Sequence, residues 1–235
     1  MRHTNENTRI TTTFYQQYPK FHVAVDCIIF GFKKGQLKVL LQKRPFEPRQ
    51  GEWSLMGGFV NRDEDIDDAA KRVLRSLTGL HDLYMRQVGA FGSVHRDSGN
   101  RVVSIAYFAL VDIDKVSSDL NYQNAAYWED LEDLPPLLFD HQEMVRKALL
   151  CLRTLVSSRP VGFHLLPPLF TLTQLQQLYE AILGDSIDKR NFRKRINEML
   201  FIEKTEEIDR KTSKRGSILY LFNERAFDEV KIFKL

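Results

Sequence analysis

Runs of β-branched and aromatic residues, separated by turn signals, occupy much of the first half of the chain. The runs His22–Phe32 and Leu37–Lys43 flank a Lys-Lys-Gly-Gln turn and predict a hairpin-like pair of strands. Three further runs, Trp53–Val60, Val88–His95 and Val102–Val111, predict additional strands. The sequence RDSGNR between the last two is a turn signal. This part of the chain is therefore expected to form a sheet.

Between the third and fourth predicted strands, the apolar residues change to a helical period. A helix from about Ile66 to Thr78 would have one apolar face, and Gly79 is placed to end it. The apolar face consists of Ile66, Ala69, Ala70, Val73, Leu74 and Leu77. Acidic residues at its start suit the positive end of the helix dipole. A second possibility is that they gather a cation; these residues are Glu64, Asp65, Asp67 and Asp68.

A second helical pattern begins at Asp140 and joins the two halves of the chain. Asp140 can cap this helix, and Glu143 lies three residues further on, as in a capping box. Ser157, Ser158 and Pro160 end it. The residues along its apolar side are Met144, Val145, Ala148, Leu149, Leu152, Leu155 and Val156. Such a helix is well placed to couple two modules, although simple packing produces the same pattern.

Two short helices with a tight connection follow. Thr171 and Gln174 have capping-box spacing at the start of the first helix, and Gly184 stops it. The second helix starts near Ser186 to Asp188. Its predicted inner face consists of Phe192, Ile196, Met199 and Leu200. Because the second helix is basic, the pair predicts a helix-turn-helix.

Positive charge covers the outside of this second helix and returns in a predicted hairpin. Phe201–Glu203 and Ile218–Phe222 resemble two strands, and the basic segment between them has the pattern of a wing. A charge run is usually only a solvated surface, but here charge falls on both the helix and the hairpin tip, where a winged helix meets DNA. The candidate DNA-binding residues are Lys189, Arg190, Asn191, Arg193, Lys194, Arg195, Lys211, Lys214 and Arg215. The last three are expected to contact phosphate, and which helix residue reads bases stays open.

Length and charge favour a two-domain protein. The chain has 235 residues, enough for two domains that each bury a core. Residues 1–139 carry 17 Lys and Arg against 18 Asp and Glu, whereas residues 140–235 carry 17 against 13. The positive excess of the second part indicates a polyanionic partner. The predicted boundaries are an N-terminal arm over 1–20, a mixed α/β domain over 21–139, a connecting helix over 140–158 and a DNA-binding domain over 159–235.

The arm and the cysteines add little chemistry. The polar arm is expected to be disordered or to pack against a partner subunit, and contact with DNA phosphate is a less favoured alternative. Cys27 and Cys151 are isolated, so neither a zinc site nor a disulfide framework is predicted. The chain shows no apolar signal core and no stretch long enough to cross a membrane. We expect a cytoplasmic protein without a membrane partner, metal or cofactor.

The stretch GGFVNRDEDIDDAAKRVLRSLTGL, from Gly57 to Leu80, resembles the Nudix box. Five positions of that family motif match when the two are aligned on Gly58: Glu64, Arg72, Leu74, Gly79 and Leu80. The three helix carboxylates of the motif are replaced by Val73, Ser76 and Leu77. None of these can hold Mg²⁺, a hard cation that prefers carboxylate oxygen. The resemblance therefore implies a Nudix-like fold without metal-assisted hydrolysis.

The order of a Nudix-like domain, a connecting helix and a winged helix resembles the Nudix-related bacterial transcriptional regulators. The segments that carry this resemblance are LPPLLFDH at Leu134–His141, LLPPLFTLTQLQQLYEAIL at Leu165–Leu183 and RNFRKRI at Arg190–Ile196. It implies an α/β (α+β) Nudix-like mixed-sheet sandwich followed by a winged helix-turn-helix domain. The sequence resembles the arabinose-responsive branch most. This implies a homodimeric repressor of sugar utilisation genes that binds a near-palindromic double-stranded operator.

The effector is expected in the Nudix-like domain, with L-arabinose releasing DNA through a tilt of the helix from Asp140 to Val156. An uncharged polyol needs hydrogen bonds and no metal, which suits a box without its carboxylates. The candidate effector residues are Gln42, Lys43, Arg44, Gly57, Gly58 and Phe59. For the strand-end residues among them, an ordinary solvated strand end is an equal alternative. Two functional alternatives are an ADP-ribose-sensing regulator of NAD metabolism and a Nudix hydrolase with unconventional carboxylates.

Overall fold

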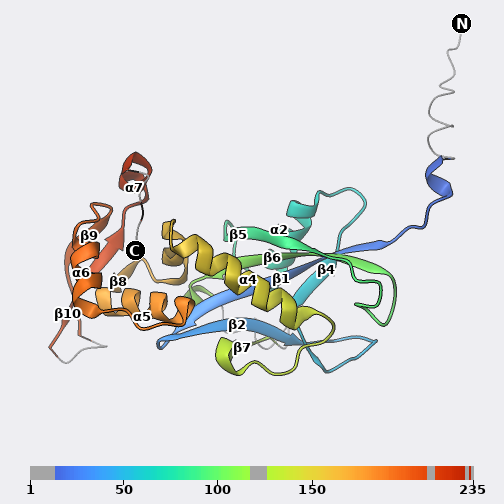
Figure 1. The fold of residues 1–235 in the computed structure, drawn as a ribbon, viewed down its shortest axis with the longest axis horizontal. Helices are drawn as coiled ribbons and strands as arrows, with labels where there is room; N and C mark the ends of the chain where they lie inside the picture. The colour runs from blue at the N-terminus through green and yellow to red at the C-terminus, as the bar shows by residue number, and fades with distance from the viewer. Residues whose placement is uncertain (1–13, 117–125, 211–214, 231–232, 234–235) are drawn as a thin grey trace, which may run out of the picture.

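The computed structural model describes residues 14–116, 126–210, 215–230 and 233. Its first part is a seven-stranded mixed sheet (Figure 1). The strands are β1 (His22–Lys33), β2 (Gln36–Lys43), β3 (Trp53–Ser54), β4 (Met56–Phe59), β5 (Tyr84–Phe91), β6 (Val102–Val111) and β7 (Ala126–Asp130). The order is β3-β2-β1-β6-β5, with β4 paired to β1 and β7 to β2. Strands β1 and β6 are parallel and the other pairs are antiparallel, which confirms the predicted mixed sheet.

Two helices cover opposite faces of this sheet. They are α2 (Ile66–Thr78) and α4 (His141–Val156), both with the bounds that their apolar periods predict. Because successive side chains of a strand point to opposite faces, β1 supplies both cores. Cys27 and Ile29 pack in the cluster that contains the apolar face of α2, whereas Ile28 and Phe30 pack in the cluster that contains α4. Figure 1 shows α4 lying across the sheet and reaching the second part of the chain.

The predicted single strand over residues 53–60 is divided in two. Ser54 pairs with Gln42 of β2, whereas Met56 pairs with Cys27 of β1. Leu55, which is buried, lies between the two short strands. The strand predicted over Val88–His95 is β5, which runs over Tyr84–Phe91. It begins further toward the N-terminus than predicted, because its pairing with β6 begins at Tyr84. Ile66 was expected on the buried face of α2 and is instead 40% exposed.

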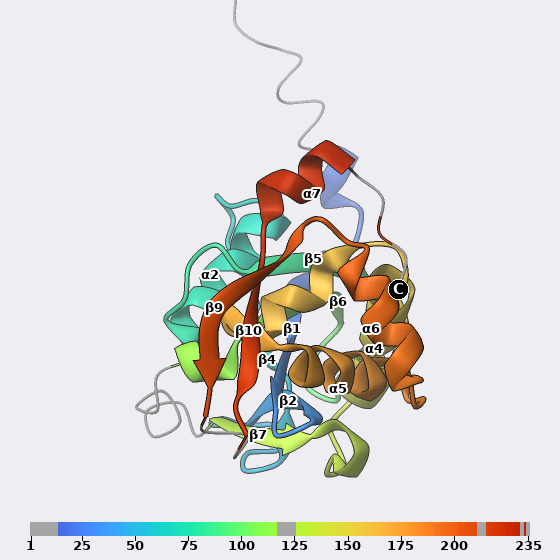
Figure 2. The same cartoon turned by 90° about the vertical axis from the view of Figure 1, so that its left-hand side faces the viewer.

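The second part of the chain contains a helix pair and a three-stranded antiparallel sheet (Figure 2). Its elements are η3 (Pro160–Leu165), β8 (Leu169–Thr171), α5 (Leu172–Leu183), α6 (Lys189–Asn197), β9 (Ile202–Asp209), β10 (Ser217–Phe222) and α7 (Glu224–Val230). Strand β10 lies between β8 and β9. The capping box of Thr171 and Gln174 is present, and Gly184 ends α5 with φ +80. The helix-turn-helix and the wing hairpin are therefore confirmed.

The end of α6 differs from the prediction. The helix stops at Asn197, so Met199 and Leu200 lie beyond it, and Leu200 is 79% exposed. Phe192 and Ile196 are buried and form the inner face by themselves. The helical spacing that placed Met199 and Leu200 on the side of Ile196 does not apply beyond Asn197, because the helix ends there.

The two parts share one hydrophobic core, although each was expected to bury its own. Buried residues on the α4 face of the sheet, such as Phe30, belong to the same contiguous cluster as Leu175 of α5 and Phe192 of α6. The residues of η3 lie between them, and the ring of Phe163 stacks on Phe222 at 4.5 Å. None of the helices in the described part of the chain is long and apolar enough to span a membrane.

Candidate functional site

The frame of the Nudix-like box is held by a salt bridge. Arg72 donates from Nε to Glu64 Oε2 at 2.9 Å and from Nη2 to Glu64 Oε1 at 2.6 Å, and a second Nη2 bond reaches the Phe59 carbonyl at 2.9 Å. The backbone N–H of Asn61 also donates to Glu64. The hydrogen bond from Arg72 holds the pKa of Glu64 at about 2. These contacts fix the loop between β4 and α2.

Val73 and Ser76 stand at two of the three positions where the Nudix motif has helix carboxylates, and both contact neighbouring atoms. Val73 is buried and lies against Gly58, where an added Cβ would be 3.0 Å from its Cγ2 atom. Ser76 donates from its hydroxyl to the Val73 carbonyl. Two acids near the start of α2 are also engaged, Asp67 by the Tyr107 hydroxyl and Asp68 by Lys71. No cluster of three His, Cys, Asp or Glu side chains suited to a metal ion occurs among the residues described.

A pocket of about 200 Å³ lies beside this frame. Five of the six candidate effector residues line it: Gln42, Arg44, Gly57, Gly58 and Phe59. The sixth, Lys43, places its Nζ atom 3.7 Å from the centre of the Trp53 ring and does not line the pocket. Gly57 is required by close packing, since a Cβ there would meet the side chain of Asp26 and lie 2.7 Å from the Val25 carbonyl. The pocket therefore joins ends of β2 and β4 that are separate in sequence.

Aromatic rings and a guanidinium form further walls of the pocket. The Arg44 guanidinium lies 4.2 Å from the Phe46 ring centre and 5.5 Å from that of Phe139, and all three residues line the cavity. Phe46 is 55% exposed. An exposed ring beside a cation at a cavity mouth can stack on a planar ligand group, while the cation can bind an anionic one.

Buried charges that the sequence analysis missed lie at the base of the pocket. Arg96, whose side chain is 3% exposed, donates to Asp140 from Nε and Nη2 at 2.9 and 2.7 Å. Its Nη2 atom lies 3.5 Å from Asp26 Oδ2, which also accepts the Ser104 hydroxyl at 2.6 Å. Burial lowers the pKa of Arg96, but the bond to Asp140 and the charge of Asp26 outweigh burial and raise it. The guanidinium is therefore held in its charged form between two carboxylates.

His141, the first residue of α4, completes this group. Its Nδ1 atom accepts the backbone N–H of Leu55 at 3.1 Å, and its Nε2 atom lies 3.8 Å from Asp26 Oδ1. Burial lowers the pKa of His141, so the neutral ring is favoured. The neighbouring His95 is exposed, whereas Arg96 is buried.

The predicted capping role of Asp140 is wrong. Its side chain makes no cap hydrogen bond to α4 and pairs with Arg96 instead. Glu143 is likewise taken by Arg146, at 2.7 Å. The Asp140 carboxylate binds the buried guanidinium of Arg96 and does not cap the helix, because a charge-assisted bidentate bond is stronger than a single bond to a backbone N–H.

The signals for the charged group were weak but present in the sequence. Asp26 is the only charge in the apolar run HVAVDCIIFGF, and a charge is rarely buried in a strand unless it is paired. Asp140 and His141 end the segment LPPLLFDH. Nothing in the sequence pointed to Arg96, which follows a strand in an ordinary turn.

The basic face of the helix-turn-helix is exposed as predicted. All six candidate DNA-binding residues on α6 have exposed side chains: Lys189, Arg190, Asn191, Arg193, Lys194 and Arg195. Within the described residues, no salt bridge engages the five basic side chains of this set. Asp188 caps the helix by accepting the Asn191 N–H at 2.8 Å. Arg215 is exposed beside the wing, and Lys211 and Lys214 lie outside the described residues.

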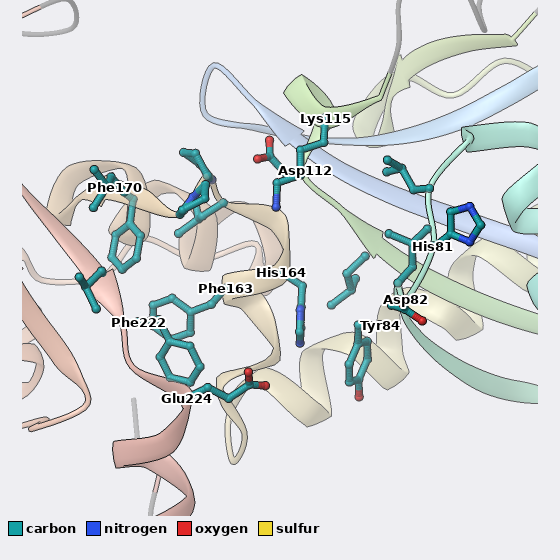
Figure 3. A pocket seen from close by; sticks show the side chains of 18 residues that line it. His81, Asp82, Tyr84, Asp112, Lys115, Phe163, His164, Phe170, Phe222 and Glu224 are labelled. Atoms are coloured by element: carbon teal, nitrogen blue, oxygen red, sulfur yellow. The ribbon is translucent and has the colours of Figure 1, made fainter.

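A larger cavity of about 510 Å³ lies where the two parts of the chain meet (Figure 3). The Tyr84 and His164 rings stack within it, with centres 5.0 Å apart and an interplanar angle of 25°. Lys115 and Glu224 extend into the same space from opposite sides. Burial lowers the pKa of His164. None of the six candidate effector residues lines this cavity.

Comparisons with known proteins agree with both parts of the fold. The NUDIX domain family matches residues 20–148, and the NrtR DNA-binding winged helix domain matches residues 162–222. The ADPR responsive transcriptional repressor NtrR of Acinetobacter baylyi is 34% identical over 215 residues, 90% of this chain and 86% of that protein.

Two solved structures of one protein are also similar. The crystal structure of Shewanella oneidensis NrtR complexed with a 27mer DNA has a TM-score of 0.79 and 28% identity, covering 90% of this chain and 97% of that chain. The cocrystal structure of the NUDIX domain of Shewanella oneidensis NrtR complexed with ADP ribose has a TM-score of 0.51 and 27% identity. It covers 63% of this chain and 99% of that chain.

These relatives overturn one expectation. An L-arabinose effector and a role in sugar utilisation are wrong, because the similar regulator responds to ADPR and the similar NUDIX domain binds ADP ribose. The inference from lost metal carboxylates to an uncharged sugar failed for a physical reason. Guanidinium groups such as that of Arg44 can bind a diphosphate without a metal ion.

Proposed function

Because this chain belongs to the Nudix-related transcriptional regulators with an NrtR-type winged helix, we propose that it is an ADP-ribose-responsive repressor of NAD metabolism genes. The observation that carries the proposal is the combination of the pocket in the NUDIX domain with an unpaired basic helix in the DNA-binding domain. The first suits a small anionic ligand and the second suits a polyanion.

The chemistry of the pocket supports a ligand with a charged middle and a planar end. Arg44 offers a guanidinium for the diphosphate of ADP-ribose. Phe46 and Phe139 offer rings near Arg44 on which an adenine can stack. Gln42 donates to the Leu55 carbonyl and keeps its own carbonyl oxygen for a ligand hydroxyl. An uncharged pentose would offer no anionic group to the guanidinium.

We propose that the chain binds this ligand without hydrolysing it. Val73 and Ser76 stand at aligned carboxylate positions and are packed or bonded to backbone, and Glu64 is committed to Arg72. A hydrolase would need oxygen ligands for Mg²⁺ that these residues do not supply. Incubation of ADP-ribose with the protein and Mg²⁺ or Mn²⁺ tests this. Turnover at enzyme-like rates that is lost in Glu64→Gln would favour the hydrolase alternative.

A homodimer that reads a near-palindromic operator is also part of the proposal. The residues before β1 expose several aromatic side chains, including Phe14 at 55% and Tyr15 at 66%. An exposed aromatic cluster of this kind is typical of an association surface. Two copies of α6 related by a two-fold axis would read half-sites of mirrored sequence. The molar mass measured in solution, with and without DNA, tests the dimer.

The effector proposal is tested by DNA titrations. A DNA fragment selected by the protein from a random pool is titrated with protein in the presence of ADP-ribose, L-arabinose or D-xylose. We expect ADP-ribose alone to weaken binding, by roughly 5- to 150-fold. Arg44→Gln should reduce this response without changing DNA affinity in the absence of ligand. Arg75→Gln, an exposed arginine on α2, is the matched control. Failure of ADP-ribose to shift the wild-type curve would reject the proposal.

A further inference from the structure

We propose that the ion pair between Arg96 and Asp140 is a latch that couples the effector pocket to α4, and that an anionic effector opens it by taking Arg96 from Asp140. The inference rests on the proposed function, because it assigns the regulation of that same pocket. It concerns residues on three segments of the NUDIX domain, at the point where α4 begins.

Arg96 lines the pocket and is shared between two carboxylates. Its bonds to Asp140 are short and bidentate, whereas its distance to Asp26 is 3.5 Å. Asp26 has other partners, since it accepts the Ser104 hydroxyl and lies near His141. Asp140 therefore depends on Arg96 more than Asp26 does. A ligand anion that takes the guanidinium would therefore leave Asp140, more than Asp26, without a partner.

Asp140 connects the pocket to the first turn of α4. It directly precedes His141, the first residue of the helix. Its carboxylate accepts hydrogen bonds from Arg96 and none from the backbone N–H groups at the start of the helix. The ring of His141 accepts the Leu55 N–H, and the Leu138 N–H donates to the Trp53 carbonyl at 3.0 Å. The start of α4 is thus tied to the pocket walls by polar contacts on both sides of Asp140.

The far end of α4 contacts the DNA-binding domain. Arg153 donates from Nε to the Ile182 carbonyl of α5 at 2.7 Å. Leu152 and Val156 are fully buried in the cluster that also contains Leu178 of α5. A helix of 16 residues spans about 24 Å and moves as a rigid element. A change at Asp140 is therefore transmitted to α5, which supports α6.

The pocket is small for the proposed ligand. Its volume is about 200 Å³, whereas ligand pockets usually measure roughly 300–1,000 Å³. An effector as large as ADP-ribose therefore fills the pocket and contacts its walls. Phe139 and His141, on either side of Asp140, belong to these walls. A guanidinium binds phosphate and carboxylate with the same bidentate geometry, so a diphosphate is a direct competitor of Asp140.

Asp140→Asn tests the latch because it removes the charge and keeps the shape. In the latched state α4 holds the position that binds DNA, so the variant is expected to bind the selected DNA fragment roughly 5- to 150-fold more weakly than wild type without any ligand. Since linkage is reciprocal, its affinity for ADP-ribose should rise by a comparable factor. A variant that was merely damaged would lose affinity for both.

Glu143→Gln is the matched control. It makes the same charge change one turn further along α4, where Glu143 pairs with exposed Arg146. We expect DNA and ADP-ribose affinities within about 2-fold of wild type, since exposed pairs contribute little. Thermal unfolding of each variant reports whether it folds. Should Asp140→Asn not fold, Arg96→Lys replaces it, because lysine keeps the charge and loses the bidentate bond. That variant is expected to show weaker DNA binding and a smaller ADP-ribose response.

The outcomes separate the latch from the proposed function. If wild type releases DNA with ADP-ribose but Asp140→Asn keeps wild-type affinity for both ligands, the latch is excluded and the proposed function stands. The latch is also excluded, and the proposed function stands, if Asp140→Asn weakens DNA binding and ADP-ribose binding together. If ADP-ribose does not release DNA from wild type, both proposals fail. Opposite shifts in the two affinities, with Glu143→Gln unchanged, support the latch.

Discussion

At the scale of single residues, Glu64 and Arg72 retain a structural role that does not depend on metal. Their bidentate pair bridges the loop after β4 and the middle of α2, and Arg72 also binds the Phe59 carbonyl. Phe59 lines the pocket proposed for the effector, so the pair holds one wall of that pocket in place. The box frame is therefore useful to a ligand-binding protein even without catalysis.

Glu64→Gln should change how stability depends on acid. The pKa of Glu64 is about 2 in the folded protein and about 4.3 in an unfolded chain. Since the folded state binds fewer protons, the contribution of Glu64 is complete above about pH 4.3 and is lost as the pH falls toward 2. The thermal midpoint of wild type should therefore fall more steeply between about pH 5 and pH 3 than that of the variant.

Asp63→Asn is the control for this measurement. Asp63 lies in the same loop and makes no salt bridge with any residue that the structure describes. Its variant should keep the wild-type slope. Parallel curves for wild type and Glu64→Gln would show that the pair with Arg72 does not form in solution.

His141 should make stability depend on pH in a higher range, nearer to neutral. Burial lowers its pKa, so the unfolded state binds a proton more readily than the folded state. The stability that the neutral ring contributes is therefore complete above about pH 6.5 and is lost as the pH falls below it. Wild type should lose thermal stability between about pH 7 and pH 5, and His141→Asn should lose less. Exposed His95→Asn is the control, and an equal flattening by both variants would contradict the assignment.

The residues of the box could be predicted from the sequence, whereas the charged group around Arg96 could not. Glu64 and Arg72 are eight residues apart and belong to one local motif. Arg96 and Asp140 are 44 residues apart, and Arg96 and Asp26 are 70 apart. A pair of that kind exists only once the sheet has formed, so no spacing rule reveals it.

At the scale of elements, local signals predicted the helices and missed the strand partners. The helical period of the apolar residues and the glycines at the helix ends predicted α2 and α5, because the hydrogen bonds of a helix form within one segment of the chain. Strands take their bonds from other segments. The division of residues 53–60 and the short strand β8, which pairs with β10, were missed for this reason.

The cap of α6 provides a prediction at this scale. Asp188→Ala removes the carboxylate that accepts the Asn191 N–H, and loss of an N-cap costs about 0.5–2 kcal/mol. In a nine-residue helix, that loss should fray the first turn and weaken DNA binding. Asp185→Ala, in the same connection, removes the same charge without removing a cap. The difference between their DNA affinities therefore isolates the cap, and equal affinities would show that DNA binding does not depend on it.

At the scale of the whole molecule, the shared core makes the two parts mechanically dependent. Phe30 of the sheet, Leu152 of α4 and Phe192 of α6 belong to one buried cluster. Packed interiors transmit displacement because they contain few voids. Composition and charge predicted two parts of different function, but they could not predict that the parts share a core. That property depends on η3 and α4, whose apolar residues could equally have closed a separate domain.

The DNA surface gives the last prediction, which compares a charged wing residue with an uncharged helix residue. Arg215→Ala should weaken binding to the selected fragment and to unrelated DNA alike, and should reduce the salt slope by about one. Asn191→Ala should leave the salt slope unchanged, because it removes no charge. If Asn191 reads a base, its loss should cost about 1–3 kcal/mol on the selected fragment alone. Fluorescence titrations at several salt concentrations measure both quantities. A loss confined to the selected fragment in Arg215→Ala would contradict a phosphate contact, and a uniform loss in Asn191→Ala would contradict base reading.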